Sequence, residues 1–113
     1  ERMEQLIEEL KQDFYIAFFE TTTEGVYNGE LISLTENKGT AIRRTAELLH
    51  ENADNTIAFG DSMNDYEMLQ VCNAACGVAM GNADEKLKAI ADRVCETVWE
   101  DGVIRELKRM HII

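Results

Sequence analysis

The segment Gly60–Leu69, with the sequence GDSMNDYEML, places two aspartates and an asparagine close together directly after an apolar run. The run Thr56–Phe59 is apolar and partly β-branched, so we expect a buried strand, and the glycine that follows permits a sharp turn into a helix. Asp61 then stands at the carboxyl end of a parallel strand, where open α/β sheets bind ligands. Asn64 and Asp65 follow one helical turn later, in the same crevice. Carboxylates there suit a hard cation such as Mg²⁺, so the spacing predicts a metal or phosphate site.

Three structural interpretations compete with that prediction. Asp61 or Ser62 can cap the following helix, although capping needs one such residue rather than four polar residues in five. A calcium-binding loop is excluded by its own pattern, because Met63, Tyr66 and Cys72 stand where a ligand, a glycine and a terminal glutamate belong. A solvated acidic turn is the third alternative, and the segment alone leaves it open.

Further motifs lie before and after this segment. Residues 60–65, Gly-Asp-Ser-Met-Asn-Asp, resemble the fourth motif of the haloacid dehalogenase-like hydrolases, and residues 37–41, Asn-Lys-Gly-Thr-Ala, resemble their third, lysine-bearing motif. Residues 77–83, 91–94 and 101–103 resemble the Cof-type branch of these Mg²⁺-dependent phosphatases. The motifs occur in the expected order and extend to the C-terminal region, which makes the combination far more specific than any one of them.

The resemblance implies a phosphoryl-transfer reaction whose nucleophile is absent from this chain. Members of the family form an aspartyl-phosphate on an N-terminal Asp-x-Asp motif and hydrolyse it with the help of Mg²⁺. The sequence contains no Asp-x-Asp, and Thr21–Thr23 lie too near Lys38 to serve as the family's second motif. Since the chain also begins with Glu1, we expect it to be the C-terminal part of a longer phosphatase, with the missing N-terminal half of the same protein as its partner. A truncated gene product is the alternative.

The resemblance also assigns roles to individual residues. Lys38 would neutralise the phosphorylated nucleophile and the charge that develops in the transition state, for which a compact ammonium is suited. Asp61 would bind Mg²⁺ directly, and Asp65 would hold Lys38 or a metal-bound water. Asn64 would approach the phosphate. Asn82 is a weaker candidate for the same crevice, since capping the helix that follows it explains it equally well.

Composition and charge restrict the partners. The chain has 113 residues, of which 22 are acidic and 11 basic, and its formal net charge is −11. Such a charge opposes nucleic acid and anionic membranes, which are bound through Lys and Arg. A small phosphorylated metabolite would also be repelled, so its site needs a metal and a lysine to reverse the local field. The sequence shows no run long and apolar enough to span a membrane and no signal peptide.

The cysteines and histidines do not indicate a further site. Cys72, Cys76 and Cys95 are odd in number and lack a Cys-x-x-Cys pair, so we expect buried free thiols rather than a disulfide or a zinc site. This cysteine usage fits a reducing cytoplasm. His50 and His111 are expected on helices, as solvated or lightly buried side chains.

The hydrophobic period changes along the chain and predicts two units. Residues 1–36 show an amphipathic helix that ends near Lys11 and an antiparallel strand pair, which the resemblance suggests is the end of a mobile α+β cap. Residues 37–113 alternate helices with strands, which predicts an α/β fold with a parallel sheet, the C-terminal portion of a Rossmann-like haloacid dehalogenase-like core. The expected strands are residues 15–19, 30–34, 56–59, 75–79 and 93–95, and the later helices are 39–52, 64–71, 82–90 and 102–110.

Two functional classes remain. The favoured one is the C-terminal fragment of a cytoplasmic Mg²⁺-dependent phosphatase acting on small phosphorylated metabolites, with sugar phosphates as an example. The other is a catalytically silent binding or assembly module that kept the lysine and acidic motifs and lost the nucleophile. An apolar strand followed by Asp-x-Asp in the upstream sequence would distinguish them.

Overall fold

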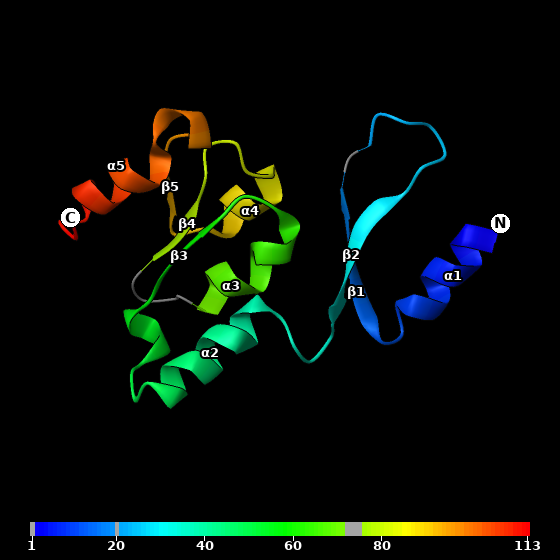
Figure 1. The fold of residues 1–113 in the computed structure, drawn as a ribbon, viewed down its shortest axis with the longest axis horizontal. Helices are drawn as coiled ribbons and strands as arrows, with labels where there is room; N and C mark the ends of the chain where they lie inside the picture. Colours follow the sequence, from blue (N-terminus) through cyan, green and yellow to red (C-terminus); the bar gives the residue numbers. More distant parts are fainter. Residues whose placement is uncertain (1, 20, 72–75) are drawn as a thin grey trace.

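The computed structural model describes residues 2–19, 21–71 and 76–113, and its strands form two separate sheets (Figure 1). The first is an antiparallel pair of β1 (Phe14–Phe19) and β2 (Asn28–Ser33), preceded by α1 (Arg2–Leu10). The second is parallel, in the order β3-β4-β5, with β3 (Ile57–Gly60), β4 (Cys76–Ala79) and β5 (Arg93–Val94). The helices of this second part are α2 (Lys38–Leu48), α3 (Tyr66–Val71), α4 (Glu85–Ile90) and α5 (Gly102–Arg109).

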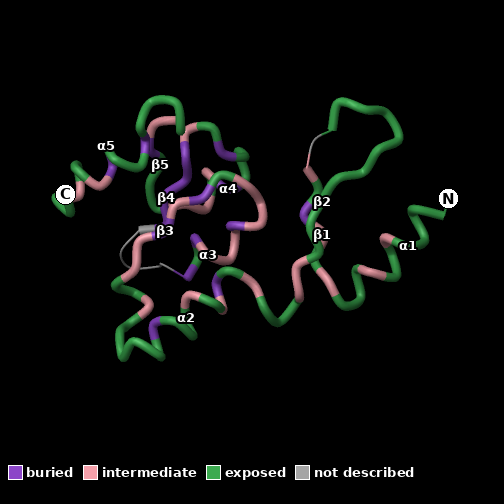
Figure 2. Tube along the Cα trace, viewed as in Figure 1, coloured by how far each residue is buried: buried purple, intermediate pink, exposed green. Residues whose placement is uncertain are grey.

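The parallel sheet is built around a central buried strand. Val78 and Ala79 of β4 are fully buried, and Leu69 of α3 and Leu87 of α4 are the largest fully buried apolar side chains of the same cluster. Burial in Figure 2 is concentrated on β3, β4 and α3, whereas α1 has no buried residue. This arrangement confirms the expected α/β fold with a parallel sheet. Strands of such a sheet are covered on both faces, which is why they could be predicted from short continuous apolar runs. No helix in the described part of the chain is long and apolar enough to cross a membrane.

The small sheet and the parallel sheet are joined by residues 34–37 (Figure 1). This connection is locally ordered, because the hydroxyl of Ser33 accepts hydrogen bonds from the backbone N–H groups of Thr35 and Glu36, at 3.2 and 3.3 Å. Glu36 also forms an ion pair with Arg44 of α2, at 2.6 Å. The chain therefore enters α2 along a short path that its own side chains hold in place.

The expected helix over residues 39–52 ends earlier than the sequence suggested, at Leu48. His50 has a left-handed backbone with φ 56°, and its N–H bonds the carbonyl of Glu47 while Glu51 N–H bonds that of Ala46. This pair of bonds is a Schellman motif, which terminates the helix. His111, with φ 57°, ends α5 by the same pattern. The expectation that both histidines lie on helices was therefore wrong, since each lies just beyond a helix end with its side chain exposed.

The expected helix over residues 82–90 begins three residues late, at Glu85. Asp84 caps it, because its side chain accepts a hydrogen bond from the backbone N–H of Lys86 at 2.8 Å. A short aspartate before a helix is among the preferred caps. The suggestion that Asn82 caps this helix was thus wrong, because the cap is Asp84, two residues later.

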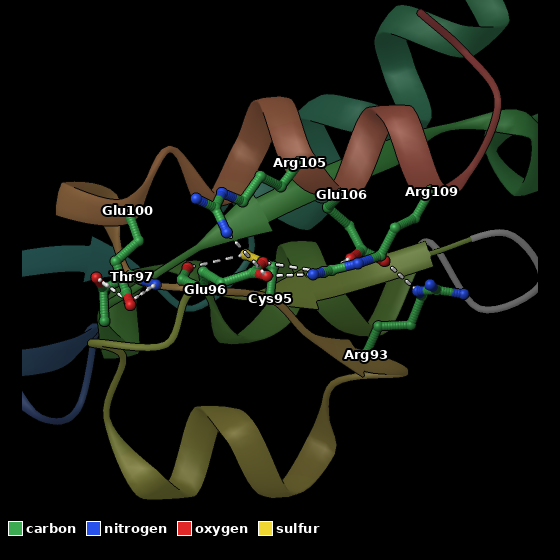
Figure 3. Close-up of polar contacts among 8 residues, drawn as sticks. All are labelled: Arg93, Cys95, Glu96, Thr97, Glu100, Arg105, Glu106 and Arg109. Atoms are coloured by element: carbon green, nitrogen blue, oxygen red, sulfur yellow. Dashed lines mark hydrogen bonds and ion pairs between the residues drawn. The ribbon is translucent and has the colours of Figure 1, made fainter.

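The C-terminal helix is attached through a network of charged side chains that Figure 3 shows. The side chain of Glu106 is 2% exposed and bonds Arg93 of β5 and Arg109 of its own helix. Arg109 also bonds Glu96, which follows β5. Buried carboxylates need such partners, so the network fixes α5 against the edge of the sheet.

Cys95 lies beside this network and is a buried free thiol, as expected. Burial, followed by the negative charge of Glu106, raises the pKa of the thiol above its ordinary value. The thiolate that would be reactive is therefore disfavoured. Cys72 and the side chain of Cys76 lie outside the described part of the chain.

Candidate functional site

The candidate site is organised around the carboxylate of Asp65, whose side chain is 8% exposed. One oxygen accepts a hydrogen bond from the ammonium of Lys38 at 2.5 Å. The other accepts from the backbone N–H groups of Asp61 and Ser62, at 3.0 and 3.4 Å. Three donors therefore surround one buried negative charge, which satisfies the requirement that a buried charge be paired.

The close approach of Asp65 to β3 depends on Gly60, the last residue of that strand. A Cβ atom at position 60 would lie 2.7 Å from the Cβ of Asp65 and 3.1 Å from its carboxyl group. Real carbon atoms do not approach so closely without displacement. The glycine before the acidic segment thus leaves the space that Asp65 occupies. Its backbone is not left-handed, so the turn itself does not require a glycine.

Lys38 is placed by the start of α2. The side chains and backbones of Asn37 and Thr40 form a reciprocal capping box, which fixes Lys38 as the first residue of the helix. Gly39 lets α2 approach α3, because a Cβ there would lie 2.8 Å from the carbonyl oxygen of Glu67. The two helices bring Lys38 to Asp65 across 27 residues of sequence. The structure therefore brings these two predicted site residues into direct contact.

Asp61 lies at the carboxyl end of β3 with its side chain exposed, as the sequence predicted. Its backbone is held on both sides, since its N–H bonds Asp65 and its carbonyl accepts a hydrogen bond from the N–H of Asp84 at 3.1 Å. An exposed carboxylate on a fixed backbone has the chemistry of a Mg²⁺ ligand. No group of three His, Cys, Asp or Glu side chains that could hold a metal exists among the residues that the structure describes. The exposed carboxylate of Asp61 thus fits the chemistry of one Mg²⁺ ligand.

Asn64 lies in the same turn and is held at both ends of its amide. Its Oδ1 accepts a hydrogen bond from the hydroxyl of Ser62 at 2.6 Å, and its Nδ2 donates one to Glu30 at 2.7 Å. No sequence pattern indicated Glu30, because the contact joins residues 34 positions apart and depends on where the small sheet lies.

Asn82, the weaker candidate, lies elsewhere in the hydrogen-bond network. Its Oδ1 accepts a hydrogen bond from the backbone N–H of Val98 at 2.9 Å. The residue therefore has a structural role in holding the segment that precedes α5.

The family model for haloacid dehalogenase-like hydrolases matches residues 1–107. The chain belongs to this family. Phosphatase YwpJ of Bacillus subtilis (strain 168) is 45% identical over 84 residues, which cover 74% of this chain and 29% of that protein. A second protein of that strain, 5-amino-6-(5-phospho-D-ribitylamino)uracil phosphatase YcsE, is 36% identical over 92% of this chain and 40% of its own length. The resemblance inferred from the motifs is confirmed.

Solved structures of haloacid dehalogenase-like hydrolases support the same family assignment. A sugar phosphatase of subclass IIB superposes with a TM-score of 0.78 and 30% identity, covering 98% of this chain and 41% of that protein. A haloacid dehalogenase-like hydrolase from B. subtilis gives a TM-score of 0.71 and 39% identity, covering 93% of this chain and 36% of its own. The chain thus spans well under half the length of these relatives.

Proposed function

We propose that this chain is the C-terminal part of a Mg²⁺-dependent phosphatase that hydrolyses small phosphorylated metabolites in the cytoplasm through an aspartyl-phosphate. The observation that carries the proposal is the contact of Lys38 with Asp65 beside the exposed carboxylate of Asp61. The ammonium of Lys38 suits the negative charge of a phosphoryl group, and the exposed carboxylate of Asp61 suits the positive charge of a metal ion. Both lie at the carboxyl end of β3. The named relatives, which include phosphatases acting on a phosphoribityl compound and on sugar phosphates, support a small phosphorylated substrate.

The chain's own residues would act by holding charge and geometry. Lys38, oriented by Asp65, would neutralise negative charge on the phosphoryl oxygens as it develops, and Asn64 would donate its amide N–H to one of them. Asp61 would hold Mg²⁺, which when bound supplies Lewis-acid polarisation of the phosphoryl group. The nucleophilic aspartate would come from the N-terminal half of the longer protein, here called the parent. We further propose that residues 1–36 end its cap and that residues 37–113 belong to its catalytic core.

The test compares the purified parent with the 113-residue chain on p-nitrophenyl phosphate and a panel of sugar phosphates, with Mg²⁺ and with a chelator. We expect turnover by the parent that depends on Mg²⁺, and none by the chain alone, because the covalent acceptor is missing. An Asp61→Ala variant of the chain controls for contaminating phosphatases. A parent without phosphatase activity and without an upstream Asp-x-Asp would overturn the proposal in favour of a silent binding module.

A further inference from the structure

Glu30 is a residue of the small sheet that touches the candidate site. It lies on β2, opposite Ala17 in the antiparallel register, and its Oε2 accepts the hydrogen bond from Asn64 Nδ2 at 2.7 Å. Nothing in the motifs assigns a role to it, and it precedes the motif that contains Lys38. The sequence motifs therefore do not explain the contact of Glu30 with Asn64.

The contact fixes the orientation of the Asn64 amide. An amide has an acceptor oxygen and two donor hydrogens on nitrogen, and either end can be exchanged by a flip of the group. Here Ser62 donates to the oxygen and Glu30 accepts from the nitrogen. A flip would turn the amide oxygen toward the carboxylate of Glu30, which can only accept, whereas the Ser62 hydroxyl could accept from the nitrogen. Glu30 is therefore the partner that leaves the second N–H of Asn64 with one fixed direction.

Residues 30–38 contact two consecutive residues of the site, Asn64 and Asp65. Glu30 bonds Asn64, and Lys38, eight positions later, bonds Asp65. The intervening connection is ordered by the Ser33 hydroxyl and by the ion pair of Glu36 with Arg44. The path from β2 into α2 thus carries two contacts to two consecutive residues of the site.

We infer that Glu30 is a positioning residue, which holds the amide of Asn64 so that its remaining N–H is directed to a phosphoryl oxygen of the substrate. The inference rests on the proposed function for the substrate and on the two hydrogen bonds of Asn64 for the geometry. What Glu30 supplies is an acceptor, and its negative charge is a disadvantage near an anionic phosphate. A glutamine at position 30 keeps an acceptor oxygen and removes the charge.

The experiment uses the parent with Mg²⁺ and compares Glu30→Ala, Glu30→Gln and Asn64→Ala. Glu24→Ala, an exposed glutamate in the loop between β1 and β2, is the matched control. We expect Glu30→Ala to raise KM about five- to tenfold, the equivalent of one hydrogen bond, with little change in kcat. Glu30→Gln should have a KM equal to or below that of the wild type. In an Asn64→Ala background, Glu30→Ala should cost nothing further, because the residue it positions is gone.

A second readout is independent of activity. In the ¹⁵N-labelled parent without substrate, the side-chain amide resonances of Asn64, assigned by their loss in Asn64→Asp, should move in Glu30→Ala and stay in Glu24→Ala. An inactive parent whose Asn64 resonances still move would overturn the proposed function and leave the positioning contact supported. Unmoved resonances, a Glu30→Gln variant as impaired as Glu30→Ala, or an additive double variant would each overturn the inference.

Discussion

At the scale of single residues, the site depends on one buried carboxylate and the donors that surround it. Asp65 accepts hydrogen bonds from Lys38 and from two backbone N–H groups. The side chain of Asp61, four positions earlier, is exposed. Two aspartates of one short motif therefore have different environments. Asp65 orients the lysine, and only Asp61 has a carboxylate free for a ligand, so their expected shared role in metal binding remains a prediction.

This difference gives a prediction for the proposed parent protein. Asp61→Asn should strongly weaken activation by Mg²⁺, because a charged hard ligand becomes neutral with the same shape. Lys38→Ala should lower kcat on the order of a hundredfold even at saturating Mg²⁺, since one preorganised charge is lost at the transition state. Steady-state kinetics at varied Mg²⁺ separate the two effects. Asp54→Asn and Lys86→Ala, which are exposed and outside the site, serve as controls, and near-normal kinetics in both site variants would mean that the pair is structural.

A second prediction concerns Gly60. Gly60→Ala places a methyl group 2.7 Å from the Cβ of Asp65, so the carboxylate must move away from its donors. We expect a loss of about 1–3 kcal/mol in the free energy of unfolding, as for other insertions into a packed site, together with a fall in kcat. Denaturant unfolding and kinetics of the parent measure both. A variant with wild-type stability and turnover would show that Asp65 has room to shift without consequence.

At the scale of elements, the sequence predicted the type and order of the main helices and strands, and it failed at their ends. The strand before Gly60 is a local pattern, so it could be recognised. The left-handed His50 that stops α2 could not be, since a histidine rarely ends a helix in this way and glycine usually does. Glu30 was missed for a related reason, because its partner is brought to it by tertiary structure.

The attachment of α5 should depend on pH. The pKa of Glu96 is held below its ordinary value of 4.5, mainly by the hydrogen bond from Arg109. A carboxylate with a lowered pKa in the folded state stabilises the fold fully above its unfolded value, and the contribution is lost as the pH falls through the lowered folded value. Glu96→Gln should therefore lower the Tm of the parent modestly at pH 5 to 7, and the difference should shrink below about pH 4.5.

Thermal unfolding across this pH range, followed by circular dichroism, provides the measurement. Glu24→Gln in the loop between β1 and β2 is the control for a lost surface charge. A Tm difference that stays constant on acidification would show that Glu96 contributes by packing rather than by its charge.

At the scale of the whole molecule, one side of the parallel sheet ends at β3 within the described chain. Beside this strand lies a groove of about 450 Å³ between α2 and β3, whose apolar lining residues include Ile42, Leu49 and Ile57. Parallel sheets are normally covered on both faces, and their edge strands are protected from pairing with other chains. We therefore expect the isolated chain to self-associate or to be marginally stable, despite a net charge of −11 that opposes aggregation.

Sedimentation velocity and binding of a hydrophobic dye check this expectation, with the parent as the reference. The isolated chain should bind more dye per mole and sediment as a mixture. A compact monomer that unfolds cooperatively and binds no dye would show instead that these 113 residues form a self-sufficient domain.

The pairing of Lys38 with Asp65 has a consequence for the dependence of phosphate binding on salt. Within that pair the charges cancel, so Asp61 and Glu30 leave the surroundings of Asn64 with net negative charge. Proteins that bind phosphate through basic patches lose affinity as ionic strength rises, because salt screens an attraction. In this protein without divalent cations, salt would instead screen the repulsion between phosphate and the carboxylates of Asp61 and Glu30. The affinity of the metal-free protein for inorganic phosphate should accordingly be weak and should increase with ionic strength, the reverse of the usual sign.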